Sequence, residues 1–147
     1  MNKTWVLITR LSAISAVAIG LVVPLVGPAR ADQRQQIIDT FAMEAKATDQ
    51  AFQAFSADRG RFLFSSNPAA GKPDTPSCTT CHTTNPLHVG QTRAGKEIAP
   101  MALSKSPTRY GDIEKVEKWF RRNCNSVLGR ECSAVEKGDY LTFMFAQ

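Results

Sequence analysis

Histidine and cysteine are scarce in this chain of 147 residues, which contains two histidines and four cysteines. Both histidines and two of the cysteines fall within residues 77–88, SCTTCHTTNPLH. Any site that needs imidazole is therefore confined to this segment. Its Cys78-x-x-Cys81-His82 pattern fits three kinds of site: the attachment site of a c-type haem, one half of a zinc site, or a redox dithiol.

The sequence also lacks the alternation of apolar and polar residues that predicts a β-strand, and it has no internal repeat or low-complexity stretch. The dithiol of a thioredoxin lies between a strand and a helix of a parallel sheet, so a redox dithiol is disfavoured. A basic run and an aromatic platform are missing as well, so nothing indicates a nucleic-acid partner.

The long apolar stretch of the chain lies near its start. Lys3 and Arg10 are followed by residues 11–29, which are apolar or small apart from Ser, Gly and Pro, and an Ala-Arg-Ala sequence comes next. This layout predicts a secretory signal peptide, residues 1–31, that is cleaved after Ala31. An uncleaved membrane anchor is the alternative, because the apolar stretch is just long enough to span a bilayer.

Cleavage leaves residues 32–147, a length that suits one domain with a modest core. The loss of Lys3, Arg10 and Arg30 lowers the formal net charge from +5 to +2, so the high isoelectric point says little about partners. We expect this domain in an oxidising compartment, where pairs of cysteines tend to form disulfides.

Helical patterns dominate the mature chain. Apolar residues recur at helical spacing over residues 34–57, which predicts a long first helix with Gly60 as its C-terminal cap. The apolar residues 62–64 are then expected to enter the core. Pro and Gly are frequent on both sides of the Cys/His segment, which predicts loops at residues 65–77 and 83–107.

Two further helices are predicted toward the C-terminus. Asp112 is a suitable N-cap for the first of them. The second opens with Ser133-x-x-Glu136, which is a capping box. Gly138 inside this helix costs about 1 kcal/mol relative to alanine, so we expect it to allow another helix to approach closely. The predicted fold class is all-α.

A c-type haem is the interpretation that agrees with the rest of the chain. A zinc site needs a second close pair of ligands, and Cys124 and Cys132 are eight residues apart. In a haem site, Cys78 and Cys81 form thioethers with the haem vinyl groups, and the adjacent His82 ligates the iron. We therefore predict one covalently bound haem c.

Longer motifs make this prediction more specific. From about residue 60 to residue 146 the chain resembles the SHP-type monohaem cytochromes c, a group of oxygen-binding class I cytochromes. The motifs are SCTTCH at 77–82, GKEIAP at 95–100, KVEKWFRRNCN at 115–125 and LGRECSAVEKGD at 128–139. The resemblance implies a class I cytochrome c fold and a periplasmic location. It also implies Asn123 as distal iron ligand and a disulfide between Cys124 and Cys132.

The residues themselves leave the distal ligand open. Class I cytochromes usually use methionine, and the candidates are Met43, Met101 and Met144. Met101 lies on a loop that could reach the iron, whereas Met144 lies on the last predicted helix and is more typical of core filling. His88 follows His82 so closely that the chain would have to pass around the haem edge, so it is expected to face solvent. An iron without a sixth protein ligand is a further alternative.

Asn123 ends an apolar stripe of the middle helix. The stripe consists of Val116, Trp119, Phe120 and Asn123, and Asn125 lies well off it. A buried asparagine needs a polar partner, which an iron with a free position would supply. The alternative role of Asn123 is that of a helix C-cap, because asparagine tolerates the left-handed conformation.

An amide oxygen ligand would give the haem particular properties. Oxygen is a hard donor that prefers ferric to ferrous iron, while methionine sulfur does the opposite and raises the potential. A haem held by His82 and Asn123 should be high-spin when oxidised, have a low potential and lose its distal ligand on reduction. We predict an exported electron-transfer cytochrome whose reduced iron binds a diatomic ligand such as oxygen or nitric oxide.

Two other functions stay open. A plain electron carrier keeps its distal ligand, whereas a haem enzyme acting on oxygen or nitric oxide species needs an acid or base near the iron. Arg121 and Arg122 could supply charge there, but their basic helix face is more typical of solvent exposure. We expect a monomer with a redox protein as partner, which surface lysines could steer if it is acidic. These lysines are Lys72, Lys96 and Lys105.

Overall fold

Five helices and one short antiparallel ribbon form the part of the chain that the computed structural model describes, residues 28–147. The elements are α1 (Pro28–Thr48), α2 (Ala57–Ser65), α3 (Thr79–His82), β1 (Gly90–Gln91), β2 (Glu97–Ile98), α4 (Ile113–Val127) and α5 (Ala134–Phe145). The two strands pair antiparallel, with Gly90 opposite Ile98. This helical composition confirms the predicted all-α class.

The predicted signal peptide lies mostly outside the described residues. Because α1 begins at Pro28, the expected cleavage point after Ala31 falls in the first turn of this helix. Of the helices described, none combines the length and the apolar character needed to cross a bilayer.

The predicted caps of the last two helices are confirmed. The carboxylate of Asp112 accepts a hydrogen bond from the backbone N–H of Lys115 at 3.1 Å, and α4 begins there. The hydroxyl of Ser133 accepts from the backbone N–H of Glu136, whose carboxylate in turn accepts from the N–H of Ser133. Both pairs satisfy N–H groups that have no partner inside their own helix.

The predicted helix over residues 34–57 is wrong in its second half. α1 ends at Thr48, and Ser56 caps a separate helix, α2. Directly after α1, the Asp49 carboxylate accepts a hydrogen bond from the backbone N–H of Ala51 at 2.9 Å. Such local bonds of aspartate to the backbone compete with continued helix. The apolar residues that continue the spacing, Phe52 and Phe55, lie in the connection between the two helices, where their ring centroids are 4.9 Å apart and Phe55 packs against the core.

Gly60 lies inside α2, so the prediction that it forms the C-terminal cap of the first helix is wrong. A Cβ at this position would be 2.0 Å from the carbonyl oxygen of Asp139, so the glycine lets the backbones of α2 and α5 approach closely. Gly138 on α5 gives room to the Phe55 ring, which would lie 2.2 Å from an added Cβ. The packing reason predicted for Gly138 is thus present, although its neighbour is a side chain from the connection before α2.

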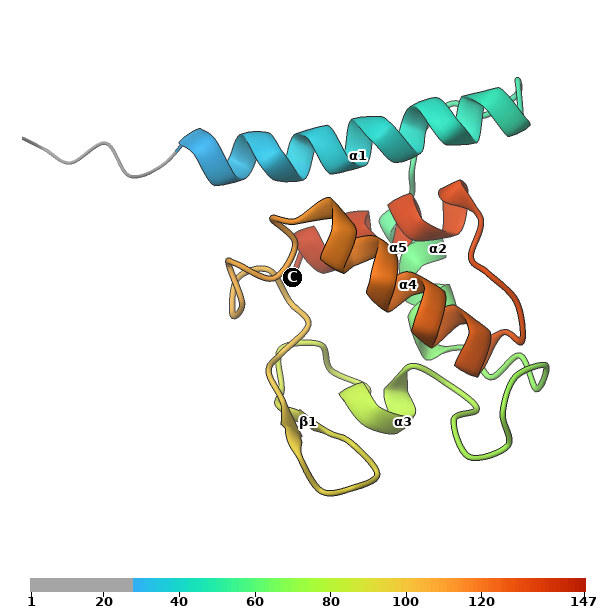
Figure 1. Ribbon diagram of the computed structural model, residues 1–147, viewed down its shortest axis with the longest axis vertical. Coiled ribbons are helices and arrows are strands. Elements are labelled where there is room, and N and C mark those ends of the chain that lie inside the picture. Colours follow the sequence, from blue (N-terminus) through green and yellow to red (C-terminus); the bar gives the residue numbers. More distant parts are fainter. Residues whose placement is uncertain (1–27) are drawn as a thin grey trace, which may run out of the picture.

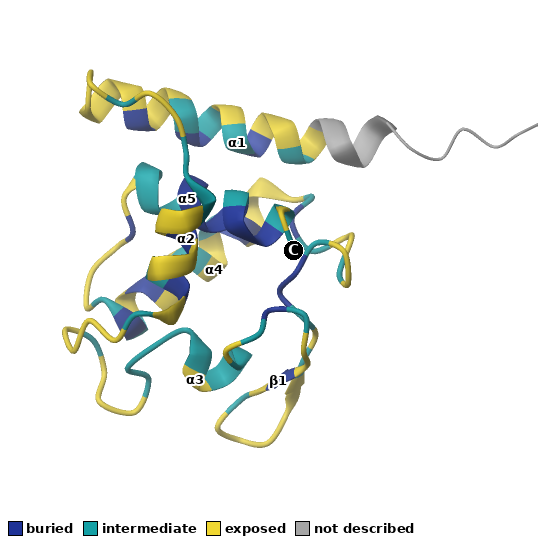
Figure 2. Cartoon of the chain, turned by 180° about the vertical axis from the view of Figure 1, so that it is seen from behind, coloured by how far each residue is buried: buried dark blue, intermediate teal, exposed yellow. Residues whose placement is uncertain are grey.

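The core lies where α1, α4 and α5 meet α2. Figure 1 shows α1 lying across α4 and α5, and in Figure 2 its buried residues face them. The largest fully buried side chains are Phe41, Phe64, Leu141 and Met144. Phe62 was expected in this core, but it is 74% exposed because successive residues of a helix are rotated by about 100°.

A buried carboxylate fastens α2 to α5. Asp139 on α5 is 3% exposed, and its carboxylate accepts a hydrogen bond from the backbone N–H of Ser56 at 2.6 Å. It also accepts two from the Arg59 guanidinium, at 2.6 Å from Nε and 2.8 Å from Nη2. The first turn of α2 is therefore fixed against α5, ahead of the loop that leads to α3.

Candidate haem site

The Cys/His segment forms α3 and the residue before it. The backbone N–H groups of Cys81 and His82 both donate to the carbonyl of Cys78, at 3.3 and 3.1 Å. Thr83 has a φ of +60° and ends the helix. One turn of helix therefore holds both cysteines and the histidine close together. Both cysteines are partly buried.

His82 is suited to bind a metal. Burial, and after it the charge of Arg109, lower the pKa of His82 to about 4. Its Nδ1 is buried and has no hydrogen-bond partner among the residues described. Neutral imidazole is the form that ligates metals, because it has a free lone pair on one ring nitrogen. The side chain thus has the protonation state that an axial haem ligand requires.

Cys78 does not have the properties of a redox dithiol. Burial raises the pKa of its thiol to about 11. Reactive dithiols depend on the opposite shift, since only the thiolate attacks a disulfide. A buried, neutral Cys78 thiol fits covalent haem attachment better than redox exchange.

The other two cysteines form a disulfide, as predicted. Cys124 on α4 and Cys132 before α5 are bonded, with a Cα–Cα distance of 5.5 Å. These two sulfurs are therefore not available to complete a zinc site with Cys78 and Cys81. The disulfide also fixes the last turns of α4, directly after Asn123.

The predicted apolar stripe of α4 divides into two faces. Val116 is buried, and Phe120 packs against Phe41 and Tyr140 with ring centroids 6.0 and 5.5 Å apart. Trp119 is 52% exposed and Asn123 is exposed too. These two residues are one turn apart and share a flank of the helix.

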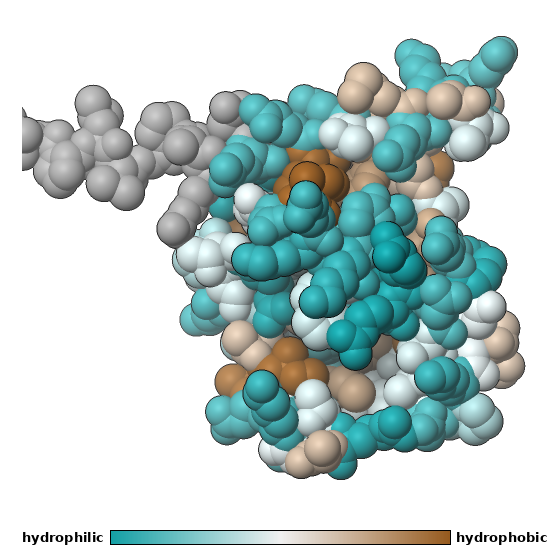
Figure 3. Space-filling view, viewed as in Figure 1, coloured by the Kyte–Doolittle hydropathy of each residue, from teal (hydrophilic) through white to brown (hydrophobic). Residues whose placement is uncertain are grey.

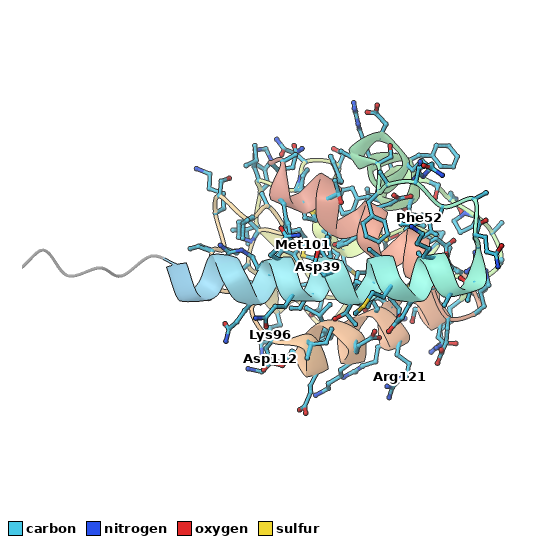
Figure 4. The ribbon with its side chains drawn as sticks, turned by 90° about the horizontal axis from the view of Figure 1, so that it is seen from above. Asp39, Phe52, Lys96, Met101, Asp112 and Arg121 are labelled. Atoms are coloured by element: carbon cyan, nitrogen blue, oxygen red, sulfur yellow. A yellow bond between two sulfur atoms is a disulfide. The ribbon has the colours of Figure 1, made fainter. Side chains whose placement is uncertain are left out.

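The exposed surface of α4 is mainly hydrophilic (Figure 3). The Arg122 guanidinium lies over the Trp119 ring, 5.2 Å from its centroid. Arg121 is exposed and points away from the body of the molecule (Figure 4). This agrees with the expectation that the two arginines face solvent.

The other candidate ligands occupy different surroundings. Met101 and Met144 are 7% and 0% exposed and belong to the core cluster, while Met43 is 68% exposed on α1. His88 is exposed, with its Nε2 at 3.4 Å from the side-chain nitrogen of Asn85. The expectations of a core role for Met144 and a solvent-facing His88 agree with these positions.

Arg109 is a residue of the site that the sequence did not reveal. Its Nε donates to the carbonyl of Pro100 at 3.1 Å, and its Nη2 donates to the carbonyl of Ala99 at 2.7 Å. These bonds hold its charge near His82, whose pKa it lowers. No sequence motif predicts this contact, because it depends on how the loop before α4 folds back.

Comparison with known proteins identifies the chain's relatives. Residues 50–144 match the family described as "Domain of unknown function (DUF1924)". The chain is 48% identical to the cytochrome c-type protein SHP of Cereibacter sphaeroides, over 95% of this chain and 99% of that protein. It is 30% identical to cytochrome c'' of Methylophilus methylotrophus, over 77% of this chain and 79% of that protein.

Solved structures of the same two relatives resemble the structure of this chain. A structure of oxidised SHP, described as an oxygen-binding cytochrome c, matches with a TM-score of 0.72 and 49% identity, over 78% of this chain and 96% of that one. The crystal structure of oxidised cytochrome c'' matches with a TM-score of 0.67 and 29% identity, over 79% and 95% of the two chains. These likenesses confirm the cytochrome c fold and one haem c as cofactor. The chain belongs to the family described as DUF1924 and to the SHP family of c-type cytochromes.

Proposed function

We propose that this protein is an exported electron-transfer cytochrome whose haem is held by His82 and Asn123 and which binds a diatomic ligand when reduced. The observation that carries the proposal is the exposed Asn123, next to the disulfide-bonded Cys124, in a chain 49% identical to an oxygen-binding cytochrome c. Asn123 is on a flank of α4 that the apolar core does not cover, so its amide is accessible to the haem iron.

The proximal side of the site consists of Cys78, Cys81 and His82. Cys78 and Cys81 would hold the haem as thioethers to its vinyl groups, which would keep the cofactor attached in every redox state. His82 supplies a neutral ring nitrogen to the iron. The Arg109 charge beside it favours this neutral form.

Asn123 supplies the distal ligand through its amide oxygen. When bound, the haem would supply one-electron redox chemistry and a position for a small ligand. The amide oxygen is a hard donor, so its affinity is lower for ferrous than for ferric iron. Asn123 therefore binds in the oxidised protein and leaves the position free on reduction.

The surroundings of Asn123 favour ligand binding and electron transfer over catalysis. Its neighbours one turn away on the same flank of α4 include Trp119 and Ser126. An indole and a serine hydroxyl do not exchange protons readily near neutral pH. The flank thus lacks the acid or base that an enzyme acting on bound oxygen would use.

Export and partner choice belong to the same proposal. Residues 1–31 direct export to the periplasm and are removed after Ala31, and residues 32–147 form one monomeric domain. The disulfide is in keeping with an oxidising compartment. The partner is a redox protein with a small interface, and the exposed Lys72, Lys96 and Lys105 favour an acidic one.

An optical experiment with two matched variants tests the proposal. Spectra of the ferric and ferrous protein give the spin state, and mixing the ferrous protein with carbon monoxide gives the rate of ligand binding. The wild type should be high-spin when ferric and should bind carbon monoxide rapidly. Asn123→Met should be low-spin, have a higher potential and bind carbon monoxide slowly, because sulfur stays on ferrous iron.

Asn125→Met is the control, since Asn125 is exposed two residues further along α4 and its amide donates to the Arg121 carbonyl at 2.7 Å. It should resemble the wild type in all three properties. A wild type that is low-spin in both oxidation states and ignores carbon monoxide would refute the proposal. A buried methionine such as Met101 would then be the better ligand, and the function would be plain electron transfer.

A further inference from the structure

The carbonyl of Ser126 joins α4 to the loop that precedes α3. This carbonyl lies in the last turn of α4, where carbonyls have no partner inside the helix. It accepts a hydrogen bond from the backbone N–H of Lys72 at 2.7 Å and one from the Thr75 hydroxyl at 3.2 Å. The loop thus supplies hydrogen-bond donors to a carbonyl at the end of α4 that the helix itself leaves without a partner.

Two glycines let the loop and the helix end approach this closely. A Cβ at Gly71 would be 2.1 Å from the Ser126 carbonyl oxygen. Gly129 has a φ of +67°, and a Cβ there would be 2.3 Å from the carbonyl oxygen of Ala70. The backbones therefore touch on both sides of the hydrogen-bonded carbonyl, and the contact fixes the two segments relative to each other.

Both segments are close in sequence to residues of the site. Thr75 precedes Cys78 by three residues, so at most about 10 Å of chain separates them. Ser126 follows Asn123 by three residues, which is about 4.5 Å along the helix axis. The contact thus connects the haem-attaching segment to the helix that carries the proposed distal ligand.

We propose that Thr75, through its hydrogen bond to Ser126, is a positioning residue for Asn123. This inference rests on the proposed role of Asn123 as an iron ligand. A helix end that is already held in place loses less conformational freedom when Asn123 binds the iron. The bond between Asn123 and the iron is therefore favoured. Without the Thr75 hydroxyl the helix end is freer, and Asn123 binds the ferric iron less often.

Azide titration of the ferric holoprotein measures this effect, because azide and Asn123 compete for one position on the iron. The Thr75→Val variant keeps the shape of the side chain and removes the hydroxyl. One lost hydrogen bond of ordinary strength corresponds to about a fivefold increase in azide affinity. Thr75→Ser retains the hydroxyl and should restore the wild-type affinity.

Two further variants separate the possible explanations. Thr142→Val removes a hydroxyl that donates to the Gly138 carbonyl at 2.8 Å within α5, and it should leave azide affinity unchanged. Asn123→Ala should raise azide affinity by itself and should abolish the effect of Thr75→Val. If Thr75→Val has no effect in the wild type, or acts equally in Asn123→Ala, the positioning role is wrong while the ligand role stands. If Asn123→Ala leaves azide affinity unchanged, the ligand role is wrong and the positioning role with it.

Discussion

Replacing Arg59 with methionine should destabilise the protein far more than the same change two residues away. Arg59 donates two hydrogen bonds to Asp139, whose side chain is only 5% exposed. Without the guanidinium, the buried carboxylate keeps one protein donor, the backbone N–H of Ser56. Methionine preserves most of the apolar length of arginine, so the change removes the charge and little of the packing.

The expected magnitude follows from the unequal burial of the two partners. Breaking a fully buried ion pair costs about 3–5 kcal/mol, because it leaves an uncompensated charge in the interior. The Arg59 side chain is 55% exposed, so water can take the place of the guanidinium beside Asp139. We therefore expect Arg59→Met to lower the free energy of unfolding by about 2–3 kcal/mol.

Urea unfolding of the ferric holoprotein, followed by circular dichroism, measures this difference. Arg61→Met is the matched control, because Arg61 pairs with Asp58 and both side chains are mostly exposed, at 64% and 83%. It should cost at most about 0.5 kcal/mol. Equal effects of the two variants would refute the claim that Asp139 fastens α2 to α5 through a buried charge.

Three other changes test separate parts of the structure. Replacing Cys124 and Cys132 by serine should lower the free energy of unfolding by about 2.5 kcal/mol, from the chain entropy of a loop with sequence separation 8; an unchanged urea midpoint would contradict this. Gly60→Ala should lower the melting temperature, because its Cβ would be 2.0 Å from the Asp139 carbonyl oxygen, and a gain in stability would show that the helices can separate freely. His82→Ala should keep the mass of the covalent haem but lose the wild-type ferric spectrum, and an unaltered spectrum would exclude His82 as axial ligand.

Local signals in the sequence predicted the elements whose ends depend on nearby residues. Asp112 and the Ser133/Glu136 capping box act within one turn, so the starts of α4 and α5 could be read directly. The end of α1 could not be read in this way, because the apolar spacing continues through Phe52 and Phe55 of the connection, where the Asp49 carboxylate accepts a bond from the backbone N–H of Ala51. The role of Gly60 depends on α5, some eighty residues later, which no local pattern reveals.

The site divides in the same way. Cys78, Cys81 and His82 lie within one helical turn, so their proximity follows from the sequence alone. The contacts of Arg109 with Pro100 and Ala99, and the exposure of Trp119, depend on how loops and helices pack. Residues about 60° apart around a helix, such as the buried Val116 and the exposed Trp119, can lie on either side of the boundary between core and surface, and periodicity does not fix that boundary.

The end of α4 is held more firmly than the side chain of Asn123. The disulfide at Cys124 contributes about 2.5 kcal/mol by chain entropy, and each hydrogen bond to the Ser126 carbonyl adds about 1 kcal/mol. Gly71 packs directly against this carbonyl as well. Moving the backbone away from the iron would oppose all of these contacts, whereas rotating the Asn123 side chain opposes none of them. In the function proposed above, release of Asn123 on reduction would therefore be a rotation of one side chain on a fixed helix, and it would not require α4 to unfold.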